Sequence, residues 1–216
     1  MDVADRCVIA TDSDEVAEAA RENGAEAVLT SPDHASGTDR VAEVAKRREF
    51  ARFDVVLNVQ GDEPFISADA VRGALGMVRG EFTVGTAAVH ASAAVLNEPS
   101  VVKIVVADDG RALYFSRAPI PYLRESKDAE DVALHRKRVW QHIGVYAYTR
   151  DALARWVKLP AHPLERIERL EQLRPLAAGW PIGVALIEGP LRRGIDTEVD
   201  LARANSEWTI FSGEPA

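Results

Sequence analysis

The sequence predicts an α/β fold, in which a mixed and mostly parallel sheet is covered by helices on both faces. Short apolar runs typical of buried strands alternate with longer segments in which apolar residues recur at helical spacing. Short turns separate these segments, and no linker or internal repeat interrupts the chain. A length of 216 residues fits one large domain, so we expect a single unit spanning residues 1–216.

The composition limits the class of protein. An apolar content of 47% supports a core, and a charged content of 28% supports solubility. The net charge of −8 argues against nucleic acid as a main partner, although local Arg and Lys side chains could still bind a nucleotide. The only cysteine, Cys7, excludes an internal disulfide. The first residues contain no apolar signal core, and no run is long enough to span a bilayer. We therefore expect a cytoplasmic protein with no membrane partner.

The first half of the chain contains three helix signals. Asp12, with Glu15 three residues later, forms a capping box, and Gly24 is placed to end that helix. Ser67 is placed to cap the third helix. In order, the expected elements are strand 7–10, helix 13–23, strand 27–30, a helix from the turn at 36–38 to about 49, strand 54–60 and a helix from 67 to about 78.

The second half contains more strands. Asp109-Gly110 is a strong turn signal between two of them. Lys103 places a charge within a strand, where it either reaches an edge or opposes a phosphate. Residues 123–138 have few apolar anchors, which indicates an exposed, mobile excursion. The expected elements are strands 82–89, 101–106, 112–116 and 140–148, helices 151–158 and 164–174, strand 182–187 and helix 197–208.

An acidic loop follows the expected strand at 54–60, in the segment Asn58-Val59-Gln60-Gly61-Asp62-Glu63-Pro64. Open α/β sheets bind their ligands at the carboxyl ends of their strands, and a proline stops the strand there. A carboxylate at that edge suits Mg²⁺ that bridges to a phosphate. The alternative interpretation of these residues is a solvated acidic turn.

Five other segments occur in a set order around this loop: His34–Arg40, Tyr114–Pro121, Gln141–Tyr146, Glu168–Arg174 and Gly194–Thr197. Together with the acidic loop they resemble 3-deoxy-manno-octulosonate cytidylyltransferases, from about Val8 to about Ala204. The resemblance implies a Rossmann-like nucleotidyltransferase fold with a β-rich excursion at about 112–148 that serves a homodimer interface. It also implies transfer of CMP from CTP to the acidic sugar 3-deoxy-D-manno-octulosonate (Kdo), with release of pyrophosphate, for lipopolysaccharide synthesis.

The resemblance implies that Asp62 and Asp196 are catalytic ligands of Mg²⁺, which would be the cofactor. Two oxygens that share one ion lie about 2.1 Å from it, so we expect the two carboxylates to approach each other. Without the resemblance, Asp196 would be a helix N-cap, although Thr197 could take that role.

The resemblance also assigns residues to the sugar acid. Arg117 would pair with its carboxylate and act in catalysis. His142 and Tyr146 share one strand face, and both could instead be satisfied core side chains. Glu168, Glu171 and Gln172 are spaced to share one helix face, which could equally be a solvated acidic face. The residues assigned to the sugar acid are Gln60, Arg117, His142, Tyr146, Glu171 and Gln172.

The nucleotide would lie along the segment that begins at His34. Small residues before a helix let backbone N–H groups approach a ligand, although serine and threonine could equally be caps and the arginine an exposed helix residue. The residues assigned to the cytosine and ribose are His34, Ser36, Gly37, Thr38 and Arg40.

The resemblance departs at the start of the chain. The family opens with a strand and a loop of the type Pro-Ala-Arg-x-x-Ser-x-Arg-Leu-Pro-Gly-Lys, and nothing like it precedes Cys7. The resemblance implies that the fold's first strand, which lies between those at 7–10 and 54–60, is missing from this sequence. We therefore expect these two strands not to pair with each other. Two alternatives follow: a cytidylyltransferase for another acidic sugar such as a sialic acid, or a catalytically inactive chain that only binds the sugar acid or a partner subunit.

Overall fold

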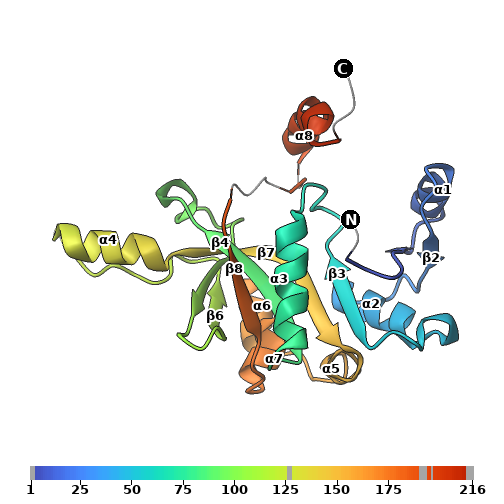
Figure 1. The fold of residues 1–216 in the computed structure, drawn as a ribbon, viewed down its shortest axis with the longest axis horizontal. Coiled ribbons are helices and arrows are strands. Elements are labelled where there is room, and N and C mark those ends of the chain that lie inside the picture. The colour runs from blue at the N-terminus through green and yellow to red at the C-terminus, as the bar shows by residue number, and fades with distance from the viewer. Residues whose placement is uncertain (1–2, 126–127, 190–193, 196, 213–216) are drawn as a thin grey trace.

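The computed structural model describes residues 3–125, 128–189, 194–195 and 197–212 (Figure 1). The strands are β1 (Ile9–Thr11), β2 (Ala27–Leu29), β3 (Val55–Val59), β4 (Val84–His90), β5 (Lys103–Val106), β6 (Ala112–Ser116), β7 (Trp140–Thr149) and β8 (Gly183–Ile187). The α-helices are α1 (Asp14–Glu22), α2 (Gly37–Lys46), α3 (Ala68–Arg79), α4 (Ala129–Arg138), α5 (Arg150–Trp156), α6 (Pro163–Glu168), α7 (Leu173–Ala177) and α8 (Glu198–Ser212). Two 3₁₀ turns lie at Arg48–Phe50 and Ala93–Val95.

The central sheet has six strands in the order β6-β5-β7-β4-β8, with β3 also paired to β7. β3, β4 and β5 are all antiparallel to β7, and β8 is parallel to β4. Four strands therefore run in one direction, which confirms the expected mixed sheet. β7 runs against these four strands, so its pairings with β3, β4 and β5 are all antiparallel, whereas β4 and β8 pair in parallel.

A bulge interrupts the pairing of β7 with β4. Thr86 pairs with Tyr146, whereas the next residue of β4, Ala87, pairs with Ile143. Two residues of β7, Gly144 and Val145, thus have no counterpart on β4. The bulge lies where β7 leaves β5 and begins to pair with β3. Bulges re-aim side chains and are frequent beside binding sites.

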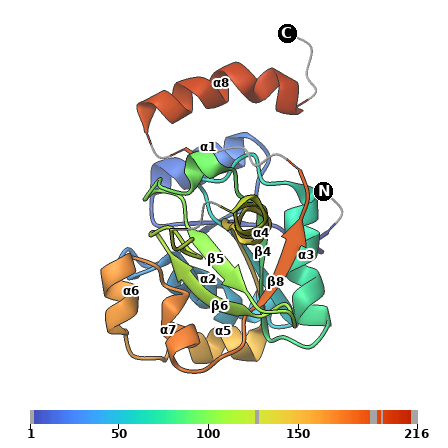
Figure 2. The same ribbon diagram turned by 90° about the vertical axis from the view of Figure 1, so that its left-hand side faces the viewer.

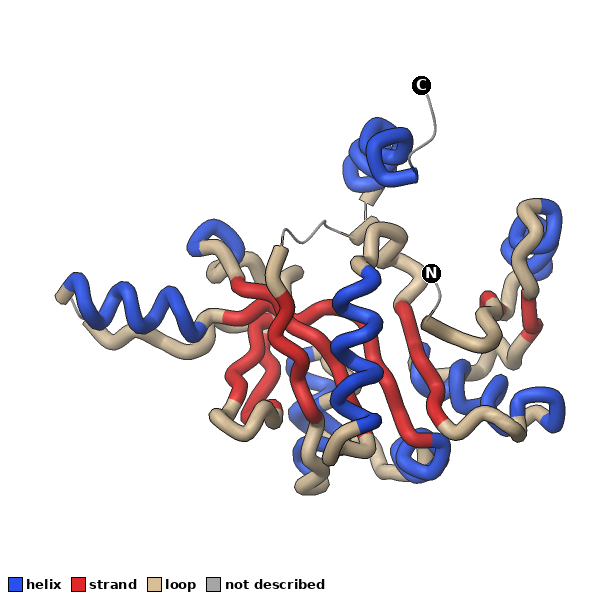
Figure 3. Tube along the Cα trace, in the orientation of Figure 1, coloured by secondary structure: helices blue, strands red, loops and turns tan. Residues whose placement is uncertain are grey.

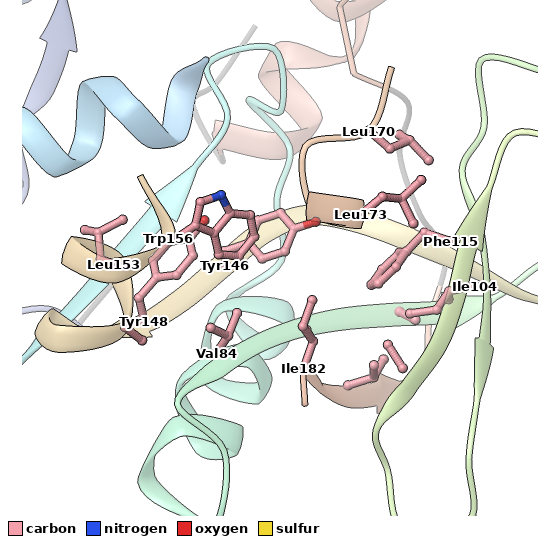
Figure 4. Packing of buried hydrophobic residues seen from close by; sticks show 14 of the residues in the cluster. Val84, Ile104, Phe115, Tyr146, Tyr148, Leu153, Trp156, Leu170, Leu173 and Ile182 are labelled. Atoms are coloured by element: carbon pink, nitrogen blue, oxygen red, sulfur yellow. The ribbon is translucent and has the colours of Figure 1, made fainter. Parts of the chain in front are cut away.

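Helices cover both faces of the sheet, as the sequence predicts. Helix α3 packs on one face through Ala70, Val71, Ala74 and Val78. The other face carries the larger core, which α2, α5 and α7 cover (Figure 1). In that core the rings of Tyr146, Tyr148 and Trp156 lie together, and Phe115 packs beside Ile104 (Figure 4).

The first strands form a sheet of their own. β1 pairs in parallel with β2, whereas β3 pairs with β7 (Figure 3). The expectation that the strands at 7–10 and 54–60 do not pair with each other is confirmed. Arg40 of α2 ties this small sheet to the rest, because it contacts Thr30 at 2.6 Å and Asp12 at 3.1 Å.

Three local expectations need correction. Ser13, not Asp12, caps α1, because its hydroxyl accepts from the amide of Val16 while Asp12 pairs with Arg40. The segment at 123–138 contains helix α4, which Asp128 caps; it is exposed as expected, with no buried residue in this helix. The predicted helix at 164–174 is two helices, since Arg169 takes a left-handed φ of 54° between α6 and α7.

Two helices project from the body. Helix α4 extends away from the sheet, whereas β6 and β7, which flank it in the chain, belong to the sheet (Figure 1). Helix α8 lies beyond the loop that joins β3 to α3 (Figure 2). Trp208 of α8 approaches Phe65 of that loop, with ring centroids 6.3 Å apart. None of the helices described is long and apolar enough to cross a membrane.

Candidate active site

The acidic loop after β3 lies against the segment that precedes α8. Asp62 is exposed, and its carbonyl oxygen accepts a hydrogen bond of 2.8 Å from the amide of Ile195. A Cβ atom on Gly194 would lie 2.7 Å from the same oxygen, so only glycine allows this approach. The residue that follows, Asp196, lies outside the described residues. Its approach to Asp62 therefore remains a prediction, although its two preceding residues lie beside Asp62.

Gln60 lies over the bulge of β7. Its amide donates to the carbonyl of Gly144 at 3.2 Å. A Cβ atom on Gly144 would be 2.7 Å from Gln60 Oε1, so the missing side chain leaves room for that amide group. Gln60 thus approaches the stretch of β7 that carries His142 and Tyr146, as the assigned roles require.

His142 and Tyr146 lie on the same face of β7, with ring centroids 5.3 Å apart. Phe115 of β6 stands edge-on to the His142 ring, at 5.3 Å. His142 Nε2 lies 2.9 Å from the hydroxyl oxygen of Thr86. Burial lowers the pKa of His142 to about 3, so the ring is neutral at physiological pH.

Tyr146 sits at the centre of a buried aromatic group. Its ring stacks on Tyr148 and meets Trp156 edge-on. Burial, with the nearby Tyr148 and Glu171, raises the pKa of Tyr146 well above its usual value. Its hydroxyl therefore stays protonated and can donate. Among the described residues, the buried polar side-chain atoms that lack a hydrogen-bond partner are Tyr146 Oη, Trp156 Nε1 and Glu171 Oε2.

Glu171 is held by a buried threonine from the opposite end of the chain. Thr38 is fully buried, and its hydroxyl donates to Glu171 Oε1 at 2.8 Å. The Tyr148 hydroxyl lies 3.4 Å from the same threonine oxygen. Thr38 therefore serves Glu171 rather than an open ligand surface. Gln172, next in the chain, is also buried. Glu171 and Gln172 both lie in the break between α6 and α7, so they do not share the single helix face that the sequence predicted.

Arg117 is anchored by backbone carbonyls at the end of β6. Its Nε donates to the carbonyl of Glu168 at 2.8 Å, and its Nη1 donates to that of Pro99 at 3.0 Å. The Glu168 carboxylate in turn accepts from the Arg117 amide at 2.9 Å and from the Ser116 hydroxyl at 2.6 Å. Nη1 also lies 3.4 Å from the carbonyl oxygen of Ser100, so Nε and Nη1 are both engaged and a substrate carboxylate would pair with Nη2.

Lys103 supports the same region and takes neither of its two expected positions. It is fully buried, and its ammonium group donates to the carbonyls of Glu98, Val101 and Arg117 at 2.8, 2.7 and 2.5 Å. Burial and the nearby Arg117 lower its pKa. Three backbone acceptors match the three donors of an ammonium group, so Lys103 fixes a loop and does not face a phosphate.

The segment from His34 to Arg40 has mixed contacts. Ser36 caps α2, because its hydroxyl accepts from the amide of Asp39, and Gly37 is the first residue of that helix. His34 Nε2 contacts Glu43 Oε2 at 2.6 Å. Arg40 contacts Thr30 and Asp12 beside the small sheet of β1 and β2. An open hollow of about 450 Å³ beside this segment is lined by Asp33, His34, Ala35, Asp39, Glu43, Lys46 and Val157.

Four residues that support the assigned side chains, Asn58 through its hydrogen bond to Tyr148, were given no role from the sequence: Asn58, Thr86, Tyr148 and Ser116. A signal existed for two of them. Tyr148 lies two residues after Tyr146 and shares its face, since side chains alternate along a strand. Asn58 is a polar residue within an apolar strand and is buried. Nothing in the chain near Thr86 or Ser116 indicates a partner, because both bind residues distant in sequence.

The mixed α/β sheet has a carboxylate loop at a strand end and a polar, aromatic site nearby, and the family match identifies the chain as an enzyme of the nucleotidyltransferase class. Residues 1–186 match the family described as Cytidylyltransferase, and the chain belongs to this family.

Comparison with individual proteins shows which cytidylyltransferases the chain is similar to. The chain is 58% identical over 210 residues to a 3-deoxy-manno-octulosonate cytidylyltransferase of Gemmatimonas aurantiaca, which covers 97% of this chain and 80% of the relative. It is 46% identical over 203 residues to the enzyme of that name from Methylococcus capsulatus, covering 91% of this chain and 78% of the relative. A solved CMP:2-keto-3-deoxy-manno-octonic acid synthetase, complexed with CTP, superposes with a TM-score of 0.81 at 37% identity, covering 95% of this chain and 81% of that one.

Proposed function

We propose that this protein transfers CMP from CTP to Kdo and releases pyrophosphate, which supplies the activated sugar for lipopolysaccharide synthesis. The observation that carries the proposal is the 58% identity, over 97% of the chain, to a relative named for this activity. Hydroxyl, amide and carboxylate side chains around β7 match the hydroxyl groups of such an acceptor, and the guanidinium of Arg117 matches its carboxylate.

In this reaction a sugar hydroxyl attacks the α-phosphate of CTP, and the bond to the pyrophosphate breaks. Charge collects on phosphoryl oxygens, so the protein contributes position and charge compensation rather than a strong nucleophile. Arg117 would pair with the sugar carboxylate through its Nη2 group, because Nε and Nη1 donate to backbone carbonyls. Gln60, Tyr146, Glu171 and Gln172 would contact its hydroxyls, and Tyr146 Oη and Glu171 Oε2 are buried groups that still lack partners within the described chain.

The residues that would hold Mg²⁺ are Asp62 and Asp196. Asp62 is exposed, and its carbonyl oxygen accepts a hydrogen bond from the amide of Ile195. The residue before Asp196 therefore lies next to Asp62, which supports a shared ion. Two carboxylates with water match the sparse protein ligation that Mg²⁺ prefers. When bound, Mg²⁺ would neutralise phosphate charge. The nucleotide itself would lie along His34, Ser36, Gly37 and Arg40, with Thr38 acting behind them.

We also propose a homodimer in the cytoplasm, where CTP is available. Support for the dimer comes from the excursion that projects from the sheet. Helix α4 has no buried residue; its Leu134 is 57% exposed, and Tyr122, earlier in the excursion, is 77% exposed. Burial of such side chains against a second copy would be favourable. Light scattering should find a dimer for the protein and a monomer for Leu134→Glu.

Pyrophosphate release, measured with CTP and Kdo, tests the function. We expect turnover that depends on both substrates, and its loss in Asp62→Asn. N-acetylneuraminic acid in place of Kdo should give no turnover. Turnover with the sialic acid instead of Kdo would replace the proposed acceptor. No turnover with either sugar, from a folded protein that binds Kdo in calorimetry, would support a binding protein in place of an enzyme.

A further inference from the structure

We infer that Thr86 sets the tautomer of His142, so that the imidazole presents Nδ1 as a hydrogen-bond acceptor for a hydroxyl of the sugar acid. The choice of ligand rests on the proposed function, whereas the tautomer follows from the protein alone. Thr86 is then a positioning residue, and His142 selects a hydroxyl group rather than an anion.

The bulge of β7 lies opposite Thr86 of β4. Thr86 is fully buried, and its hydroxyl oxygen has two neighbours: the carbonyl oxygen of Val145 at 2.7 Å and Nε2 of His142 at 2.9 Å. Val145 is one of the two bulge residues without a counterpart on β4. The hydroxyl of Thr86 thus takes the place of a ladder donor for that carbonyl.

A hydroxyl group carries one hydrogen, and a carbonyl oxygen can only accept. The hydrogen of Thr86 therefore points to Val145, since otherwise two acceptor oxygens would face each other at 2.7 Å in the core. Towards His142 the Thr86 oxygen can then offer only a lone pair. Nε2 must carry a hydrogen and donate it.

The second nitrogen follows from the charge of the ring. A neutral imidazole has one N–H, so a protonated Nε2 leaves Nδ1 without a hydrogen. The surroundings of His142 favour the neutral form: Phe115 and Tyr146 contact the ring, and burial alone accounts for the low pKa of about 3. Within the described residues no carboxylate pairs with this ring.

An unprotonated Nδ1 accepts from a donor and repels an anion. It therefore suits a sugar hydroxyl and not the carboxylate or a phosphate. Arg117, the cation assigned to the carboxylate, follows β6, the strand whose Phe115 packs against the His142 ring. The two groups thus divide the sugar acid between an acid end at Arg117 and a hydroxyl end at His142.

Nitrogen-15 NMR of histidine-labelled protein without ligand tests the tautomer directly. We expect the signals of His142, assigned by their loss in His142→Gln, to show a protonated Nε2 and an unprotonated Nδ1. Thr86→Ser keeps the hydroxyl and should keep this pattern. Thr86→Val removes it and should give a mixture of tautomers. A protonated Nδ1 in the wild-type protein would overturn the inference, whether or not the protein turns over Kdo.

Kinetics test the consequence. Loss of one positioned hydrogen bond in Thr86→Val should raise the KM for Kdo about 3- to 10-fold, whereas the KM for CTP stays unchanged. Thr86→Ser should recover most of the affinity. Urea unfolding of both variants shows whether they are folded. An equal rise in both KM values from folded Thr86→Val would overturn the role in sugar selection.

Discussion

Buried hydroxyl and ammonium groups hold the residues that are proposed to face the ligands. Thr38 contacts Glu171, Thr86 contacts His142, and the Lys103 ammonium group donates to the backbone carbonyl of Arg117. Each of these groups is enclosed by protein, so its hydrogen bonds are geometrically restricted and an unmade one is costly. Substitution of one of these three residues should therefore change substrate binding even though the residue does not contact the substrate.

Thr38→Val should weaken binding of Kdo and destabilise the fold. Val keeps the shape but leaves Glu171 Oε1 without its donor, which costs about 1–3 kcal/mol for a buried acceptor. Urea unfolding and the KM values for both substrates measure the two effects. Thr38→Ser is the matched control, because it retains the hydroxyl. A rise in the KM for CTP alone would instead place Thr38 in direct contact with the nucleotide.

Gly144→Ala should separate binding from stability. The new methyl group would meet the end of the flexible Gln60 side chain, which can move, and not rigid backbone. We expect the free energy of unfolding to change by less than about 1 kcal/mol, whereas the KM for Kdo rises several-fold because Gln60 is displaced. Loss of stability without a change in KM would show that Gln60 has no part in binding.

At the scale of elements, the close packing of α3 on β4 depends on a glycine. A Cβ atom on Gly85 would overlap the carbonyl oxygen of Ala74 and lie 2.8 Å from Met77 Cβ. The helix backbone cannot give way as a side chain can. This contact fixes α3 against the sheet and, through the preceding loop, the position of Asp62.

Gly85→Ala should therefore lower the free energy of unfolding by about 1–3 kcal/mol, the usual cost of overpacking. Gly76→Ala in α3, the helix that packs on Gly85, is the control, since nothing lies within 4 Å of a Cβ atom there. That substitution should stabilise the protein by about 0.5–1 kcal/mol, because alanine favours the helix. Equal effects of the two substitutions in urea unfolding would contradict the packing argument.

Elements that obey one periodicity could be predicted from the sequence. The strand at 140–148 is close to β7, and its alternation correctly placed His142 and Tyr146 on one face. The prediction of a single helix at 164–174 was wrong, because the spacing of apolar residues does not reveal the left-handed turn at Arg169. The prediction for Lys103 was wrong because its three acceptors are backbone carbonyls of nearby and distant loops, which a residue pattern does not reveal.

At the scale of the molecule, acid should weaken the fold through two lowered pKa values. Burial lowers the pKa of His142 from 6.5 to about 3. Arg47, with the Ser31 amide and His34, lowers that of Glu43 from 4.5 to about 2. In both cases the unfolded chain takes up its proton at a higher pH than the folded chain does. Stability is therefore lost as pH falls through each window.

We expect urea midpoints to fall as pH is lowered from about 6.5, where His142 begins to contribute, and to fall more steeply below about 4.5, where Glu43 joins it. His142→Gln should flatten the upper part of this profile. Glu43→Gln should flatten only the lower part, which makes it the matched control. An unchanged upper slope in His142→Gln would contradict the assigned cause.

The hydrogen bond from Thr38 to Glu171 joins residues 133 positions apart, one at the start of α2 and one before α7. A sugar acid that orders Glu171 would also restrain the beginning of α2, along which the nucleotide is proposed to lie. The two ligands would then share a coupling free energy, and thermodynamic reciprocity makes it the same in both directions. Whichever ligand arrives first would improve the affinity of the second by one common factor, so synergy would not depend on the order of addition.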